Sequence, residues 1–340
     1  MINYLSKRGY EFSFAWIFAI FVGGVIIFFA IYFATQIVGT QQTARDVSQS
    51  KSLGILLTPI ETELEEGKFA KIYLTDSTKL YFECKPPSSS NPFGSQNLRM
   101  SIKPPLGQKW EDNQAPAVTF HNKYFFATGE PTEFNEIYTE GEKNFYVLSK
   151  PLYLPFKIAD LMIIYSDKQK FCFENIGQAP PDFRRRMNQI NMTNVKLTGP
   201  CDPKEYEVVC FGRSCEISID QNQKKVIKNG KNLYYVLSSE EHDPYAMLYA
   251  AIFSDPDNYD CQVKRLMAHA SKLVDIYYQK SNYIYLRSAT GCNGPEIRSA
   301  LQSLNTTLAS GNILALNQFI GNEDYRNLKE SGGGIGCELF

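Results

Sequence analysis

Eight cysteines are the residues of this 340-residue chain whose type and number most directly suggest chemistry. They are Cys84, Cys172, Cys201, Cys210, Cys215, Cys261, Cys292 and Cys337. An even number of cysteines in an exported domain is typical of disulfide bonds. A zinc site needs closely paired ligands, whereas the tightest spacing here, Cys210-x4-Cys215, has no histidine nearby. We therefore expect disulfides ahead of buried free thiols, and we expect no metal and no cofactor.

The pairing of these cysteines stays open at this point, because eight cysteines allow many combinations. Cys210 and Cys215 flank a tight FGRS turn and could face each other across a hairpin. Cys261, Cys292 and Cys337 share the C-terminal part of the chain. We expect one of these three to hold the glycine-rich C-terminus in place, since an untied terminus is usually poorly ordered.

Catalytic chemistry has few candidates in this sequence. The chain has three histidines and lacks the motifs H-E-x-x-H, G-x-S-x-G, G-x-G-x-x-G and Walker A. Ser48 and Lys51 have S-x-x-K spacing but lie in a polar tether, where no rigid scaffold would hold a nucleophile. The run Glu240–Asp243 is more typical of capping and turn residues than of a proton-transfer site. We nominate no catalytic residue. The alternative, an extracytoplasmic hydrolase, would need a deep cleft that holds His242 or other ionisable residues with displaced pKa values.

Surface chemistry is indicated by two glycosylation sequons and one basic run. Asn191 and Asn305 each begin an N-x-T triplet, which is consistent with an external location. The run Arg184–Arg186 is the densest basic patch, and we expect it in an exposed loop. Over the whole chain 35 Lys and Arg are balanced by 36 Asp and Glu, which excludes a polybasic nucleic-acid-binding protein.

The element that positions all of this chemistry is an apolar segment near the N-terminus. Residues 12–38 form the predicted transmembrane helix, a signal anchor, and Phe14–Ala34 within it contains only apolar residues and glycine. At about 1.5 Å per residue such a helix matches the ~30 Å hydrocarbon core of a bilayer. A cleaved secretory signal would have a shorter apolar run and a small-x-small cleavage site. The lipid bilayer is therefore the first expected partner.

The orientation of this helix depends on few charges. Lys7 and Arg8 adjoin it on the N-terminal side, whereas the first basic residue on the other side is Arg45. By the positive-inside rule, the leader 1–11 is then cytoplasmic and the chain from the tether 39–57 onward lies outside the cell membrane.

One face of the predicted transmembrane helix carries small residues at four- and seven-residue steps. These residues are Ala15, Ala19, Gly23, Ala30 and Ala34. Small residues at this spacing let two membrane helices approach closely, so a helix–helix or envelope-protein partner is one interpretation. The other is that alanine and glycine are simply frequent in membrane helices.

The segment SKRGYEFSFAWIFAIFVGG resembles the start of uncharacterised single-pass membrane proteins that recur in small-genome archaea. That resemblance implies a location in the cell envelope and no activity. Lys7-Arg8-Gly9 before an apolar helix is also similar to the class III signal peptide of type IV pilins. In that family a peptidase cuts after the glycine and the helix packs into a filament. Tyr10 and Glu11 depart from the pilin pattern, so a pilin-like subunit is the alternative to simple anchoring.

After the tether, the fold class predicted for 58–340 is an α+β domain, β-rich over 69–237 and helical over 244–340. Within it, Asn229-Gly230 predicts a hairpin with a type I′ turn. We expect a second hairpin over Asp160–Phe173 and a short strand over Tyr283–Leu286. Together these patterns predict a disulfide-stapled external domain with a binding or structural role, and they assign it no molecular activity.

Overall fold

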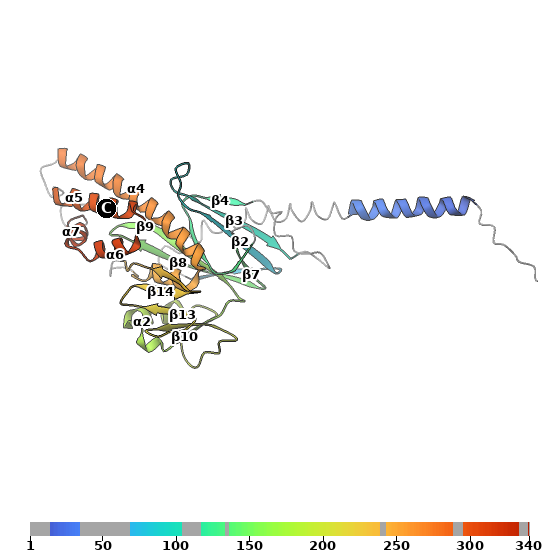
Figure 1. The fold of residues 1–340 in the computed structure, drawn as a ribbon, viewed down its shortest axis with the longest axis horizontal. Helices are drawn as coiled ribbons and strands as arrows, with labels where there is room; N and C mark the ends of the chain where they lie inside the picture. Colours follow the sequence, from blue (N-terminus) through green and yellow to red (C-terminus); the bar gives the residue numbers. More distant parts are fainter. Residues whose placement is uncertain are drawn as a thin grey trace, which may run out of the picture.

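The computed structural model, drawn in Figure 1, describes most of the chain. The described residues are 14–34, 69–103, 117–132, 136–238, 243–287, 295–332 and 339. The leader 1–11 and the tether 39–57 lie outside them. The N-terminal helix, Phe14–Ala34, is 21 residues long, and among the described residues it is the one helix long and apolar enough to cross a membrane. None of it is buried against the rest of the protein.

The other described residues form a mixed α and β structure with three sheets. The central sheet has the order β1-β8-β9-β5. Its strands are β1 (Phe69–Tyr73), β5 (Tyr124–Ala127), β8 (Asn144–Tyr153) and β9 (Lys157–Ser166). Strands β8 and β9 form an antiparallel hairpin, while β5 runs parallel to β9.

A five-stranded covering sheet packs on one side of the central sheet. Its order is β4-β3-β2-β7-β6, and all of its pairs are antiparallel. Its strands are β2 (Thr78–Lys85), β3 (Ser95–Ile102), β4 (Val118–Phe120), β6 (Glu130–Pro131) and β7 (Ile137–Gly141). Residues from both sheets form the smaller of two hydrophobic cores.

A six-stranded sheet completes the β part, in the order β11-β10-β12-β13-β14-β15. Its strands are β10 (Phe171–Glu174), β11 (Val195–Lys196), β12 (Glu207–Phe211), β13 (Ile217–Asp220), β14 (Lys225–Lys228) and β15 (Lys231–Tyr234). The predicted Asn229-Gly230 hairpin is confirmed: Lys228 lies opposite Lys231, and both turn residues have positive φ angles.

Helices follow the strands, as expected, apart from one that interrupts them. The helices are α2 (Pro181–Ile190), α3 (Ala246–Phe253), α4 (Pro256–Arg287), α5 (Pro295–Ala309), α6 (Ile313–Ile320) and α7 (Glu323–Gly332), with a short 3-10 turn η1 (Ile176–Gln178). Helices α4 to α7 gather at one end of the domain (Figure 1). Helix α2 lies within the part expected to be β-rich.

The central sheet is buried on both faces, and the alternation along β9 shows how. Leu161, Ile163 and Tyr165 point into the larger core, which contains α3 and α4. Met162 and Ile164, between them, point into the smaller core against the covering sheet. A strand buried on both faces is expected to be apolar at successive positions, and β9 is.

Helix α4 covers the free edge of the central sheet with a row of polar side chains. Asn258 Oδ1 accepts a hydrogen bond from the backbone N–H of Ala127, at 3.2 Å. Gln262 Nε2 donates to the carbonyl of Phe125, at 3.1 Å. Arg265 Nη1 donates to the carbonyl of Lys123, at 3.0 Å. These side chains therefore satisfy the edge of β5 where a further strand would otherwise pair.

Arg265 is fully buried and completes this coverage. Its Nη2 donates to the carbonyl of His121 at 3.0 Å, and its guanidinium lies 5.0 Å from the ring centroid of Tyr124. Burial lowers the pKa of Arg265 to about 10, so the side chain is still charged at neutral pH. The disulfide Cys84–Cys261 fixes the same helix to β2 of the covering sheet.

The expectations for segments 160–173 and 184–186 are wrong. The segment Asp160–Phe173 is no hairpin, because β9 pairs with β8 and β10 joins the six-stranded sheet. The run Arg184–Arg186 lies in α2 rather than in a loop, where Asp182 accepts hydrogen bonds from Arg185 and Arg186. Pro181 at the first helical position is the local signal that was available for this helix.

Candidate functional site

The six-stranded sheet has an inner face that packs into the core and an outer face with different chemistry. Phe173, Phe211 and Ile219 point inward, where α2 and α3 contribute to the larger core. On the opposite face, Cys210 lies beside Ser218, and Ser218 lies beside Ile227, on neighbouring strands. This alternation gives a sheet with one apolar face and one mixed face.

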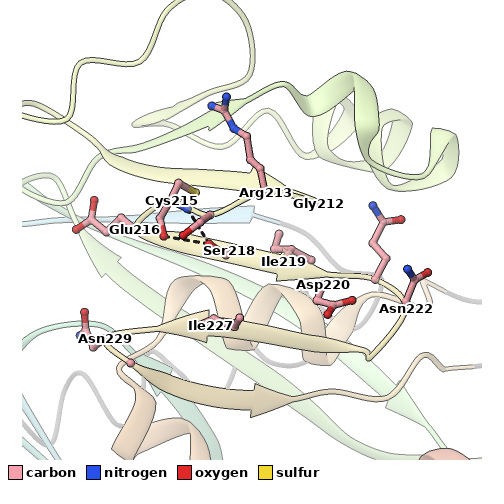
Figure 2. A pocket seen from close by; sticks show the side chains of 13 residues that line it. Gly212, Arg213, Cys215, Glu216, Ser218, Ile219, Asp220, Asn222, Ile227 and Asn229 are labelled. Atoms are coloured by element: carbon pink, nitrogen blue, oxygen red, sulfur yellow. Dashed lines mark hydrogen bonds between the residues drawn. The ribbon is translucent and has the colours of Figure 1, made fainter.

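A polar groove of about 610 Å³ is formed on the outer face (Figure 2). It is lined by Gly212, Arg213, Ser214, Cys215, Glu216, Ser218, Ile219, Asp220, Gln221, Asn222, Ile227, Asn229 and Gly230. Figure 2 shows Glu216 and Asn229 toward one end and Asp220 and Asn222 toward the other. Most of the lining is hydroxyl, amide or charged.

One wall of the groove is the loop Gly212–Glu216 between β12 and β13. These two strands pair in parallel, so the hairpin expected around Cys210 and Cys215 is wrong, although the two cysteines are bonded to each other. Parallel neighbours usually need a connection of about a dozen residues or more. Here the loop is much shorter, and Gly212, at φ 68°, takes a left-handed conformation that favours glycine.

Hydrogen bonds hold this loop against the sheet. The backbone N–H of Cys215 donates to Ser218 Oγ at 2.8 Å, and the Ser218 hydroxyl donates to the carbonyl of Cys215 at 3.0 Å (Figure 2). The N–H of Val208 donates to Glu216 Oε2 at 3.2 Å. The wall is therefore fixed by a covalent bond and by three hydrogen bonds before any ligand arrives.

Two charged side chains that line the groove contact the surrounding strands and turns. Arg213 forms an ion pair with Glu174 of β10. Asp220 Oδ1 accepts a hydrogen bond from the backbone N–H of Gln223, at 3.0 Å. Asn222 and Asn229 are exposed. Such a surface suits a polar ligand that exchanges hydrogen bonds with amides, hydroxyls and carboxylates.

The nominated cysteines have different outcomes. Three disulfides join six of them: Cys84–Cys261, Cys172–Cys201 and Cys210–Cys215. Cys172 and Cys210 both lie on the outer face of the six-stranded sheet, so two of these bonds belong to the face that carries the groove. Cys292 and Cys337 lie outside the described residues.

The other nominated residues lie away from the groove. Asn191 is exposed at the end of α2. Asn305 is half-buried in α5, where its Oδ1 accepts a hydrogen bond from Ser271 of α4 at 2.5 Å. At Gly23, on the predicted packing face of the N-terminal helix, an added Cβ would meet no atom of the described residues within 4 Å beyond the neighbouring helix backbone.

The positions of the histidines test the alternative that the domain is a hydrolase. His269 lies against the rings of Phe93 and Tyr124, and burial lowers its pKa. Its environment is that of a neutral packed side chain. His121 is exposed at the surface, and His242 lies outside the described residues.

Sequence reasoning missed the groove itself. Its floor and walls come from residues that are ordinary on their own, and only the Asn229-Gly230 turn and the Cys210/Cys215 spacing drew attention to this region. Searches against protein-family models, curated proteins and solved structures find no match to this chain. The chemistry of the groove is therefore the guide to what it binds.

Proposed function

We propose that this chain is a single-pass, membrane-anchored protein of the cell envelope whose external domain binds a polar ligand or partner. The observation that carries the proposal is the N-terminal helix Phe14–Ala34, which is long enough to span a bilayer and has none of its apolar surface buried. In water that surface would be costly to expose, whereas lipid would cover it.

The disulfides support an external location for the domain. Disulfide bonds persist in oxidising environments and are rare in the cytosol. All of the described disulfides lie after the helix, so one crossing of the membrane is enough to export them. Lys7 and Arg8 before the helix favour the matching orientation, with the N-terminus in the cytoplasm.

The groove supports a binding role. Its loop wall is fixed by the Cys210–Cys215 bond and by Ser218, which limits the ordering that a ligand must cause. Its lining offers amides, hydroxyls and carboxylates. The partner class it fits is a polar one, such as a glycan or a hydrophilic peptide segment.

Anchoring and topology can be tested on the full chain in its own membranes. We expect the protein to stay in the membrane pellet after an alkaline wash and its domain to be degraded by protease added outside cells whose outer envelope layers are removed. Recovery in the soluble fraction, or protection of the domain from the added protease, would contradict the proposal. As a control, K7E/R8E should weaken the preference for this orientation.

The N-terminal residue of the mature protein separates anchoring from its alternatives. An intact Met1 supports a signal anchor. A chain that starts at Tyr10 indicates pilin-like processing after Gly9, and a start beyond Ala34 indicates a cleaved secretory signal. Either of the last two results would overturn simple anchoring.

A further inference from the structure

A lysine and an aspartate that do not line the groove meet inside the domain. Lys150 lies on β8, and Asp243 lies three residues before the start of α3. Lys150 Nζ is 2.5 Å from Asp243 Oδ2. The two residues are far apart in the sequence, so the pair is made by the fold rather than by local chain geometry.

Both side chains are nearly excluded from water, with relative exposures of 6% for Lys150 and 9% for Asp243. Lys150 Nζ also lies 5.2 Å from the ring centroid of Tyr249, which is fully buried. Removing an ammonium and a carboxylate from water is costly, and their attraction often fails to offset that cost. A reaction that removes both charges would relieve it.

The carboxylate of Asp243 is held asymmetrically. Its Oδ2 faces the lysine amine, whereas its Oδ1 accepts a hydrogen bond from the backbone N–H of Tyr245 at 3.2 Å. Arg186 Nε lies 3.9 Å from the same Oδ1. Because Arg186 is also paired with Asp182, at 2.7 Å, its pull on the carboxylate is shared between two acids.

From this geometry we propose that Lys150 and Asp243 condense into an intramolecular isopeptide bond between Nζ and Cγ. One proton first passes from the Lys150 ammonium to Oδ2, which leaves a neutral amine and a neutral carboxyl group. The Nζ lone pair then attacks Cγ, and the negative charge that develops on Oδ1 is stabilised by the Tyr245 N–H and by Arg186.

The second half of the reaction releases water. Oδ1 returns to a carbonyl as the Cγ–Oδ2 bond breaks, and Oδ2 leaves with its own proton and a second proton from Nζ. Of the three protons on the original ammonium, two depart in the water and one remains on the amide nitrogen. The condensation needs no oxidant, no reductant and no cofactor.

The experiment is an intact-mass measurement of the full chain purified in detergent, with all disulfides reduced and alkylated. We expect a mass lower than that of the sequence by one water molecule. A tryptic digest should yield a branched peptide in which the peptide containing Lys150 is joined to the peptide containing Asp243. A mass equal to that of the sequence, with both segments recovered as separate linear peptides, would overturn the proposal.

Two features sharpen the reading of that digest. Pro244 follows Asp243 and has no N–H, so Asp243 cannot lose water by cyclising onto the next backbone nitrogen. Lys157 and Asp160 form a second ion pair on the same sheet, at 2.8 Å, but Lys157 is 37% exposed. That pair is the internal control, and normal cleavage after Lys157 is expected.

The matched variant is K150R, which keeps the positive charge but replaces the nucleophilic amine by a guanidinium that stays protonated. Its intact mass should equal that of its own sequence. If K150R still lacks one water, the loss arises elsewhere and the proposed bond is excluded. The wild-type mass decides the question even if K150R folds poorly.

Discussion

The central sheet and the six-stranded sheet bury their strands in different ways. In the central sheet successive residues of β9 enter two different cores, so neither face is available to a ligand. In the six-stranded sheet only alternate residues enter the core, and the other face holds a groove and two disulfides. The first sheet is a scaffold, and the second presents a surface.

Their cross-links differ in the same way. Cys84–Cys261 spans a sequence separation of 177 and ties α4 to the covering sheet beside the central sheet. Cys210–Cys215 spans a separation of 5 and closes one wall of the groove. A disulfide restricts the unfolded chain more when its loop is longer. The long-range bond should therefore stabilise the whole fold, and the short one should mainly shape the groove.

The largest expected effect is the loss of the long-range bond. In C84A/C261A the chain-entropy term predicts a fall of about 5 kcal/mol in the free energy of unfolding, because the loop that it closes is long. Denaturant titration of the purified domain measures it. The reference is C172A/C201A, with a separation of 29, for which the same relation gives about 3.5 kcal/mol. Equal losses in the two variants would show that loop length does not govern their contributions.

The second largest loss of stability should come from removing a polar side chain of α4 that covers the edge of β5. Arg265→Met keeps a long apolar side chain but leaves the buried carbonyls of Lys123 and His121 without this donor. We expect a loss of about 3 kcal/mol in the free energy of unfolding, since buried unsatisfied acceptors cost about 1–3 kcal/mol each.

The control for that variant is Lys264→Met on the exposed side of the same helix, where an ion pair with Asp260 is worth little. Hydrogen exchange should also quicken in β5 of Arg265→Met and stay unchanged in Lys264→Met. Equal stability of the two variants would mean that β5 does not depend on the arginine.

Local rules were enough for part of this fold. The apolar N-terminal helix and the Asn229-Gly230 hairpin follow from length and from turn chemistry, and both are present. The end of α4 shows where such rules fail. Its aromatic run Tyr283–Leu286 has strong strand propensity and predicts a short strand, yet Tyr277 and Ile284 pack at helical spacing and the helix continues.

The groove could not be predicted for a different reason. Its floor pairs Ser218 with Ile227, and its wall depends on the parallel pairing of β12 and β13 through a loop that normally signals a hairpin. Strand direction is a tertiary property that a short sequence window does not contain. The pairing of Lys150 with Asp243 was missed likewise, because the two residues meet only when β8 packs beside the segment before α3.

The smallest effect on the free energy of unfolding should come from removing the short disulfide Cys210–Cys215. This variant tests whether the bond mainly shapes the groove wall or also stabilises the whole fold. In C210A/C215A we expect a loss of about 2 kcal/mol, because the closed loop is short. Hydrogen exchange of the backbone amides over Gly212–Ser218 should nevertheless accelerate strongly in this variant. The reason is that the disulfide and the hydrogen bond to Ser218 together fix that wall of the groove. Amides of β9 should keep their protection because both of its faces stay buried. Acceleration shared equally by the groove wall and β9 would show that the short bond supports the whole fold, and the division between scaffold and presented surface would then fail.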